Sequence, residues 1–222
     1  MMGCPDSIWS GFAPGTTTFC EERLCSWIES PAIAFAAISY VLVALLIFRS
    51  SVRLTWLLRL FAWITLSMGV SSFLYHASHI LIFQAFDLTS MFALSSLMLT
   101  INLKRIKHSL THTALASIFT SLVLGAVLIF WLHPRHPGSS VFVGILAAAL
   151  VLEAAARDFS KYLGLAALCL VTALTALKLE RSNLCDPANH LFQWHAVWDS
   201  VSSLCYGLLF QHYRRFNDGL ST

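Results

Sequence analysis

Five polar residues stand within or at the ends of long apolar runs in this sequence: Ser72, His76, Asp87, His195 and Asp199. Ser72 and His76 are four positions apart, as are His195 and Asp199. On a helix, that spacing places both side chains of a pair on one face. Two imidazoles and a carboxylate are suitable ligands for Zn²⁺, and a catalytic zinc commonly takes three protein ligands and leaves a position for water. The residue types therefore predict a zinc site formed by His76, His195 and Asp199.

The other two residues suit hydrolysis. Asp87 is a candidate general base that accepts a proton from water, and Ser72 is a candidate donor to an oxyanion. The ordinary alternative for a histidine in a membrane helix is an interhelical hydrogen bond, and Ser72 can bond to a carbonyl of its own helix. Asp87 and Asp199 fit a purely structural role less well, because a carboxylate buried in a membrane needs a partner.

The composition predicts an all-α polytopic membrane protein. Hydrophobic residues make up 57% of the 222 residues and charged residues only 11%, whereas a soluble domain carries about 25% charge. The runs are continuously apolar, without the alternation of a membrane β-barrel. The first residues lack the basic and apolar regions of a cleavable signal peptide. The net charge of +3 gives no reason to expect a nucleic-acid partner.

Seven apolar runs are each close to the ~20 residues that a helix needs to cross a bilayer. We expect residues 1–30 to form an extracytoplasmic segment, residues 31–212 a single seven-transmembrane helix bundle, and residues 213–222 a cytoplasmic tail. The seven expected spans are Pro31–Phe48, Leu60–His76, Phe83–Leu103, Leu110–Leu132, Val141–Ala156, Tyr162–Leu177 and His190–Phe210.

The distribution of Lys and Arg predicts the orientation of these spans. With the N-terminus outside, ten basic residues fall on the cytoplasmic side and four on the outer side, as the positive-inside rule requires. The C-terminus is then cytoplasmic, and the five polar residues, from three different spans, converge in the outer half of the membrane. We expect an integral multi-pass protein of a bacterial inner membrane or a eukaryotic secretory-pathway membrane, with its site toward the extracytoplasmic side.

Several motifs resemble the alkaline ceramidases, which belong to a superfamily of seven-span membrane hydrolases. That superfamily also includes the adiponectin/progestin-type receptors and GPI-lipid remodelling enzymes. The similar residues are Ser72-x3-His76, Asp87 eleven positions later, and His195-Ala-Val-Trp near the last span. The N-terminal FCEER and SWIESP resemble the family's Cys-Glu and Glu-Pro region, and CDPANHLFQWHAVWD resembles its Cys-x-Pro to His-Ala-x-Trp-His stretch. The resemblance covers both ends and the middle of the chain.

The resemblance implies a zinc amidase that splits ceramide into a sphingoid base and a fatty acid. Two of the family's three zinc-binding histidines carry over onto His76 and His195, and its Ser and Asp carry over onto Ser72 and Asp87. The third histidine falls on Asp199, where this sequence departs from the family. A carboxylate ligand lowers the net positive charge of the metal and makes it a weaker Lewis acid.

The resemblance also implies two features of the N-terminal segment. Glu21 and Glu29 match acidic positions of the calcium loop in some members, but the family's nearby Asn falls on Ile33 or a neighbouring Ala. Ca²⁺ needs oxygen ligands, so the alternative is a solvated acidic cap. A family disulfide carries over onto Cys20 and Cys185, with Cys25 as the rival partner, and the outer side is an oxidising environment.

Three functions follow as hypotheses. The first is a zinc-dependent intramembrane lipid amidase whose ceramide-like substrate enters laterally from the membrane. The second is a related acyl-lipid hydrolase acting on an ester, and the third is a non-enzymatic seven-span receptor with a structural metal. The unmatched Asp199 keeps the second and third open. The sequence leaves the lipid's headgroup and chain length, and the oligomeric state, undetermined.

Overall fold

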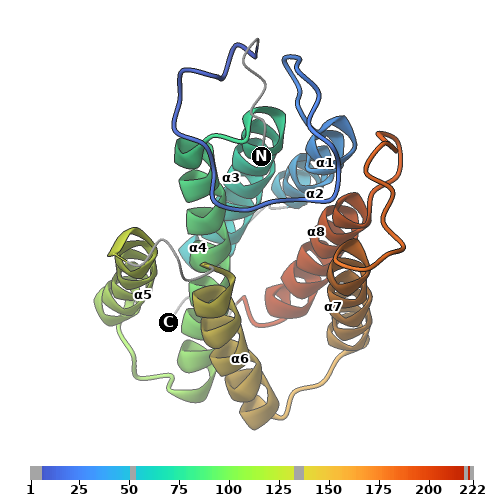
Figure 1. The fold of residues 1–222 in the computed structure, drawn as a ribbon. Coiled ribbons are helices and arrows are strands. Elements are labelled where there is room, and N and C mark those ends of the chain that lie inside the picture. Colours follow the sequence, from blue (N-terminus) through green and yellow to red (C-terminus); the bar gives the residue numbers. More distant parts are fainter. Residues whose placement is uncertain (1–6, 51–53, 133–137, 218–219, 221–222) are drawn as a thin grey trace.

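The computed structural model describes residues 7–50, 54–132, 138–217 and 220, so parts of the expected N-terminal segment and C-terminal tail lie outside the described residues. The described chain is a bundle of antiparallel helices without a strand (Figure 1). The helices are α1 (Pro31–Ala36), α2 (Ile38–Arg49), α3 (Trp56–Ser78), α4 (Leu81–Ile106), α5 (His112–Leu132), α6 (Gly138–Ala156), α7 (Lys161–Glu180) and α8 (Trp194–Arg214).

Five segments of the described chain are long and apolar enough to cross a membrane: α3, α4, α5, α7 and the joined pair α1–α2. The apolar part of α6, Val141–Ala156, is shorter, and α8, which carries His195, Asp199 and several serines, is not among the five. The predicted all-α class and membrane-like character are thus confirmed. The seven spans and the orientation of the termini stay predictions.

The start of the last predicted span is wrong by four residues. The predicted span starts at His190, whereas α8 begins at Trp194. The side chain of Asn189 accepts hydrogen bonds from the backbone N–H groups of Leu191 and Phe192, at 3.0 and 2.9 Å. This local turn competes with helix formation, because asparagine offers the backbone an alternative partner.

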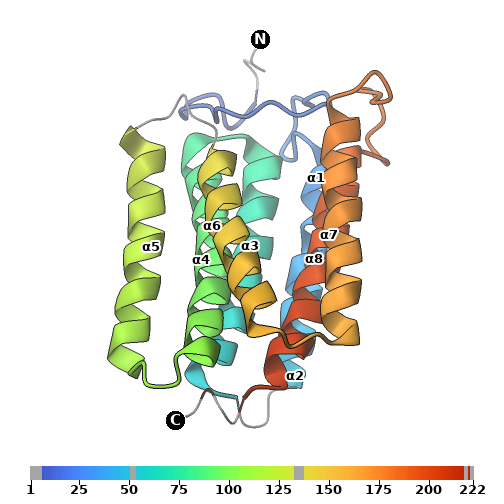
Figure 2. The same ribbon diagram turned by 90° about the horizontal axis from the view of Figure 1, so that it is seen from below.

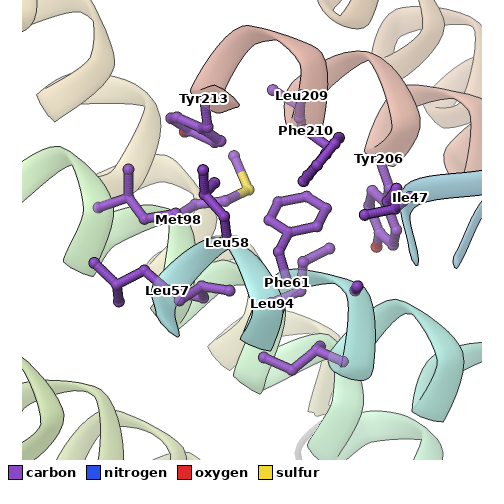
Figure 3. Close-up of a cluster of buried hydrophobic side chains, with 14 of the residues drawn as sticks. Ile47, Leu57, Leu58, Phe61, Leu94, Met98, Tyr206, Leu209, Phe210 and Tyr213 are labelled. Carbon is purple, nitrogen blue, oxygen red and sulfur yellow. The ribbon is translucent and has the colours of Figure 1, made fainter. Parts of the chain in front are cut away.

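The apolar core lies in the half of the bundle away from the N-terminal segment. Phe61 of α3 faces Phe210 of α8, with ring centroids 6.0 Å apart (Figure 3). Leu94 and Met98 of α4 extend the same cluster. The polar residues of interest are therefore at the opposite end of α3 and α8 from the most densely apolar packing.

The N-terminal segment crosses the end of the bundle between α4 and α8 (Figure 1) and lies at the same end as the α7–α8 connection (Figure 2). We call residues 13–20 the strap. The Gly15 N–H donates to the His79 carbonyl at 2.7 Å, and a Cβ at Gly15 would lie 2.9 Å from the Tyr75 ring. The Gln84 side chain bonds the backbone and hydroxyl of Thr16. Close packing thus fixes one end of the strap on α3 and α4.

A disulfide fixes the other end of the strap. Cys20 is bonded to Cys185 in the α7–α8 connection, with Cα atoms 6.4 Å apart. The predicted pairing is confirmed, and the rival partner Cys25 is bonded to neither of these two cysteines. The strap is thereby tied to both sides of the bundle end.

Candidate metal centre

His76 of α3 meets His195 and Asp199 of α8 at the end of the bundle that the strap covers. Each residue offers one ligand atom, and these atoms all lie within 4.8 Å of one another. His76 Nε2 is 3.8 Å from Asp199 Oδ2, and the two imidazole centroids are 5.1 Å apart. Because α3 and α8 run side by side, the i, i+4 pair on α8 faces the C-terminal turn of α3. The three residues form a cluster that could hold a metal ion.

The donor set fits zinc. Two nitrogens and one carboxylate oxygen are ligands that zinc accepts, and two atoms bound to one tetrahedral zinc lie roughly 3.3–3.6 Å apart, slightly closer than the 3.8 Å between His76 and Asp199. Tyr40 interacts with the Asp199 carboxyl, yet Asp199 Oδ2 is buried without a hydrogen-bond partner among the described residues. A buried carboxylate oxygen without a donor is costly, and a cation would remove that cost.

Glu180, the last residue of α7, holds His195. Glu180 Oε2 is 3.0 Å from His195 Nδ1, and both side chains are largely buried. Such a carboxylate–imidazole pair fixes the ring and leaves Nε2 for a metal. The alternative to metal ligation by Asp199 is that its carboxylate takes this orienting role. Because Glu180 makes the bond, Asp199 stays available as a ligand.

Phe19 of the strap covers the two histidines. Its ring centroid lies 4.8 Å from that of His76 and 4.6 Å from that of His195, edge to face in both cases. An aromatic ring in this position shields the imidazoles from the aqueous side. Neither Phe19 nor Glu180 was among the predicted site residues, although Phe19 directly precedes Cys20 of the predicted disulfide.

One cavity of about 810 Å³ contains all five predicted residues in its lining. The Ser72 side chain interacts with the Asp87 carboxyl, and both lie on the wall shared with the metal-ligating cluster. The structure therefore brings together the predicted metal ligands and the predicted catalytic pair. Further lining residues come from the strap, α2, α3, α4 and the end of α7, among them Thr16, Thr17, Thr18, Tyr40, Tyr75, Gln84 and Arg181.

Glu21 and Glu29, the predicted calcium ligands, lie apart from this cluster and bind protein donors. Glu21 accepts hydrogen bonds from the N–H groups of Ala32 and Ile33, at 3.0 and 3.1 Å, and so caps the start of α1. Glu29 accepts a hydrogen bond from Ser7 at 2.8 Å. Among the described residues, the metal-binding cluster does not include either glutamate. These hydrogen bonds give both carboxylates a structural role. The calcium site stays a prediction.

His79 ends α3 beside the site, with a left-handed backbone (φ 51°). Its Nε2 lies 2.7 Å from the Ser30 hydroxyl. Burial lowers the pKa of His79 to about 3, and the charges of Arg23 and His195 add to this. The ring is therefore neutral at physiological pH and links the α3–α4 turn to the start of α1.

No protein-family model matches this chain, and no curated protein matches its sequence. The resemblance to the alkaline ceramidases rests on the motif residues themselves.

Proposed function

We propose that this chain is a zinc-dependent intramembrane hydrolase that cleaves the amide bond of a ceramide-like lipid. The observation that carries the proposal is the single cavity that has His76, His195, Asp199, Ser72 and Asp87 in its lining. A metal cluster, a carboxylate and a hydroxyl on one cavity wall are the groups that hydrolysis of an acyl bond requires.

The openness of the site favours an enzyme over a receptor with a structural metal. Structural zinc sites are closed by four protein ligands, whereas catalytic sites keep a position for substrate or water. The cluster supplies three protein ligands and borders a cavity of about 810 Å³. A substrate group therefore has room to reach a metal held there.

The surroundings favour a lipid as the substrate. A second, almost wholly apolar pocket of about 200 Å³ lies between α4, α6, α7 and α8 and shares Trp198 and Tyr206 with the site cavity. In the described part of the chain, α6 packs on α4 and α7 packs on α8, but the two pairs share few direct contacts. This arrangement suits a lipid that enters laterally and places an acyl chain between the pairs.

The chain's own residues divide the work of hydrolysis. His76, His195 and Asp199 would hold a zinc ion, and the Lewis acidity of that ion would polarise a carbonyl and make water more acidic. Asp87 accepts the proton of the attacking water and returns it to the leaving amine. The Ser72 hydroxyl donates to the oxygen that gains negative charge. Phe19 limits access of bulk water, and Glu180 keeps His195 in its orientation.

We further propose that the bundle crosses the membrane seven times, with the strap on the outer side. The ten-to-four distribution of basic residues supports this orientation. The Cys20–Cys185 disulfide lies at the strap end, and disulfides persist in oxidising compartments.

Incubation of the purified full chain with an N-acylated sphingoid base tests the proposal. Mass spectrometry should detect equimolar fatty acid and sphingoid base, and chelation of zinc should abolish their release. An ester analogue of the lipid separates an amidase from an esterase. Replacement of the exposed His108, at the opposite end of the bundle, is the control and should leave turnover unchanged. Absence of products from both lipids, with zinc bound, would defeat the proposal.

A further inference from the structure

Arg181 is a cation on the wall of the site cavity that hydrolysis, as proposed, does not use. It directly follows Glu180 at the end of α7 and lines the cavity together with Leu177 and the strap residues Thr17 and Thr18. Its guanidinium takes part in none of the ion pairs found among the described residues. A charged group that faces a cavity without a protein partner is available to a ligand.

The carboxylates of the cavity do not neutralise Arg181. Asp199 and His195 are the charged groups that act on Asp87, and His195 and Glu180 are those that act on Asp199. Arg181 is not among them, because it follows the last turn of α7 whereas both aspartates lie within helices. The cavity thus carries its positive guanidinium at the rim and its reactive groups deeper.

An ordinary role for Arg181 is a solvated cation at a helix C-terminus, where the helix dipole favours positive charge. Lys178 of the same helix meets that description; Lys178 and Arg181 are both exposed, but only Arg181 lines the cavity. Lys and Arg are also less frequent on the outer side of a membrane protein, where we propose that Arg181 lies. The position of Arg181 on the cavity wall is what distinguishes the two cations.

We propose that Arg181 binds an anionic headgroup of the lipid substrate, a phosphate monoester, at the rim of the cavity. This inference rests on the proposed hydrolase function. A guanidinium pairs with phosphate through two parallel hydrogen bonds, and the hydroxyl of Thr18 is an additional donor on the same rim. A lipid in the bilayer keeps its headgroup at the aqueous surface, so the scissile carbonyl lies deeper, beside His76 and Asp199.

Steady-state kinetics of the zinc-loaded full chain on two substrates tests the inference. The substrates are an N-acylated sphingoid base and its 1-phosphate ester, both in neutral detergent micelles. Arg181→Gln should raise KM for the phosphate ester about tenfold, the loss expected for one charge-assisted pair, and leave kcat and the KM of the neutral lipid unchanged. Lys178→Gln is the matched control and should change neither KM. Equal effects of Arg181→Gln on both lipids, or none on either, would overturn the inference.

A binding measurement separates this inference from the proposed function. Native mass spectrometry of the wild type with the phosphate ester should show lipid binding that Arg181→Gln weakens, whether or not the lipid is cleaved. Binding without turnover would sink the hydrolase proposal and keep Arg181 as the headgroup ligand. Inorganic phosphate at millimolar concentration should not compete. Competition that depends on Arg181 would instead identify a site for free anions and overturn the lipid assignment.

Discussion

At the scale of single residues, Asp199 decides what kind of metal centre this is. Its buried Oδ2 has no hydrogen-bond donor among the described residues, it lies 3.8 Å from His76 Nε2, and Glu180 already holds His195. These three facts together favour Asp199 as a ligand. An anionic ligand reduces the positive charge of the metal. Replacement of Asp199 by histidine would therefore change the reactivity of the metal as well as its affinity for the site.

Replacement of Asp199 tests this assignment. Asp199→Ala should release the metal, because two ligands remain, whereas Asp199→His should retain it through an imidazole at the same position. Activity per bound zinc in the His variant should equal or exceed that of the wild type. Metal analysis by mass spectrometry, with turnover measured on the same samples, checks both results. Full metal content in Asp199→Ala would show that this carboxylate is not a ligand.

Asp87 should behave differently from Asp199. Asp87→Asn keeps the shape of the side chain and the cavity but cannot accept a proton, so zinc should stay bound while kcat falls roughly 10²–10⁴-fold. Zinc content and single-turnover rates measure the two effects separately. Loss of zinc together with activity in Asp87→Asn would show that Asp87 is part of the metal centre.

At the scale of elements, the closeness of α2 and α3 positions the site. Gly69 of α3 lies against α2: a Cβ there would sit 2.7 Å from Val41 Cγ2 and 2.8 Å from the Val41 backbone nitrogen. Small residues allow helices in membranes to approach this closely. Ser72 and His76 occupy the next two turns of α3. The contact between Gly69 and α2 therefore sets the position of these two side chains relative to α2.

Gly69→Ala should therefore destabilise the bundle by about 1–3 kcal/mol through overpacking and weaken zinc binding through the shift of His76. Gly125→Ala is a matched control, because nothing lies within 4 Å of a Cβ at Gly125 in α5, and alanine favours a helix more than glycine does. Thermal unfolding in detergent and zinc titration compare the two. Similar stability of both variants would mean that the α2–α3 contact relaxes freely.

At the scale of the whole molecule, the strap lies at the same end of the bundle as the α7–α8 connection (Figure 2). The Cys20–Cys185 disulfide joins these two segments, and Phe19 of the strap covers the histidines of the metal cluster. The positive-inside distribution predicts that this end is outside. A tag at the N-terminus should then be labelled from outside intact cells or sealed vesicles, and a tag after Thr222 only after permeabilisation. Labelling of the C-terminal tag from outside would place the site on the cytoplasmic face.

Most of the helices and the five central site residues could be predicted from the sequence. An apolar run long enough to cross a bilayer forms a helix whatever packs beside it. Helix geometry alone then places Ser72 and His76 on one face, and His195 and Asp199 on one face. Glu180 was missed because the predicted span ended at Leu177, which left this acid in a loop. Phe19 was missed because an aromatic residue in an irregular segment has no periodicity that shows what it faces.

The metal content of the purified full chain tests the central claim most directly. After purification with zinc present and removal of loosely bound ions, elemental mass spectrometry should find about one zinc per chain in the wild type, and His76→Ala and His195→Ala should each lose it. His108→Ala should keep it. A wild type without zinc, or full zinc in both site variants, would contradict a metal centre formed by His76, His195 and Asp199.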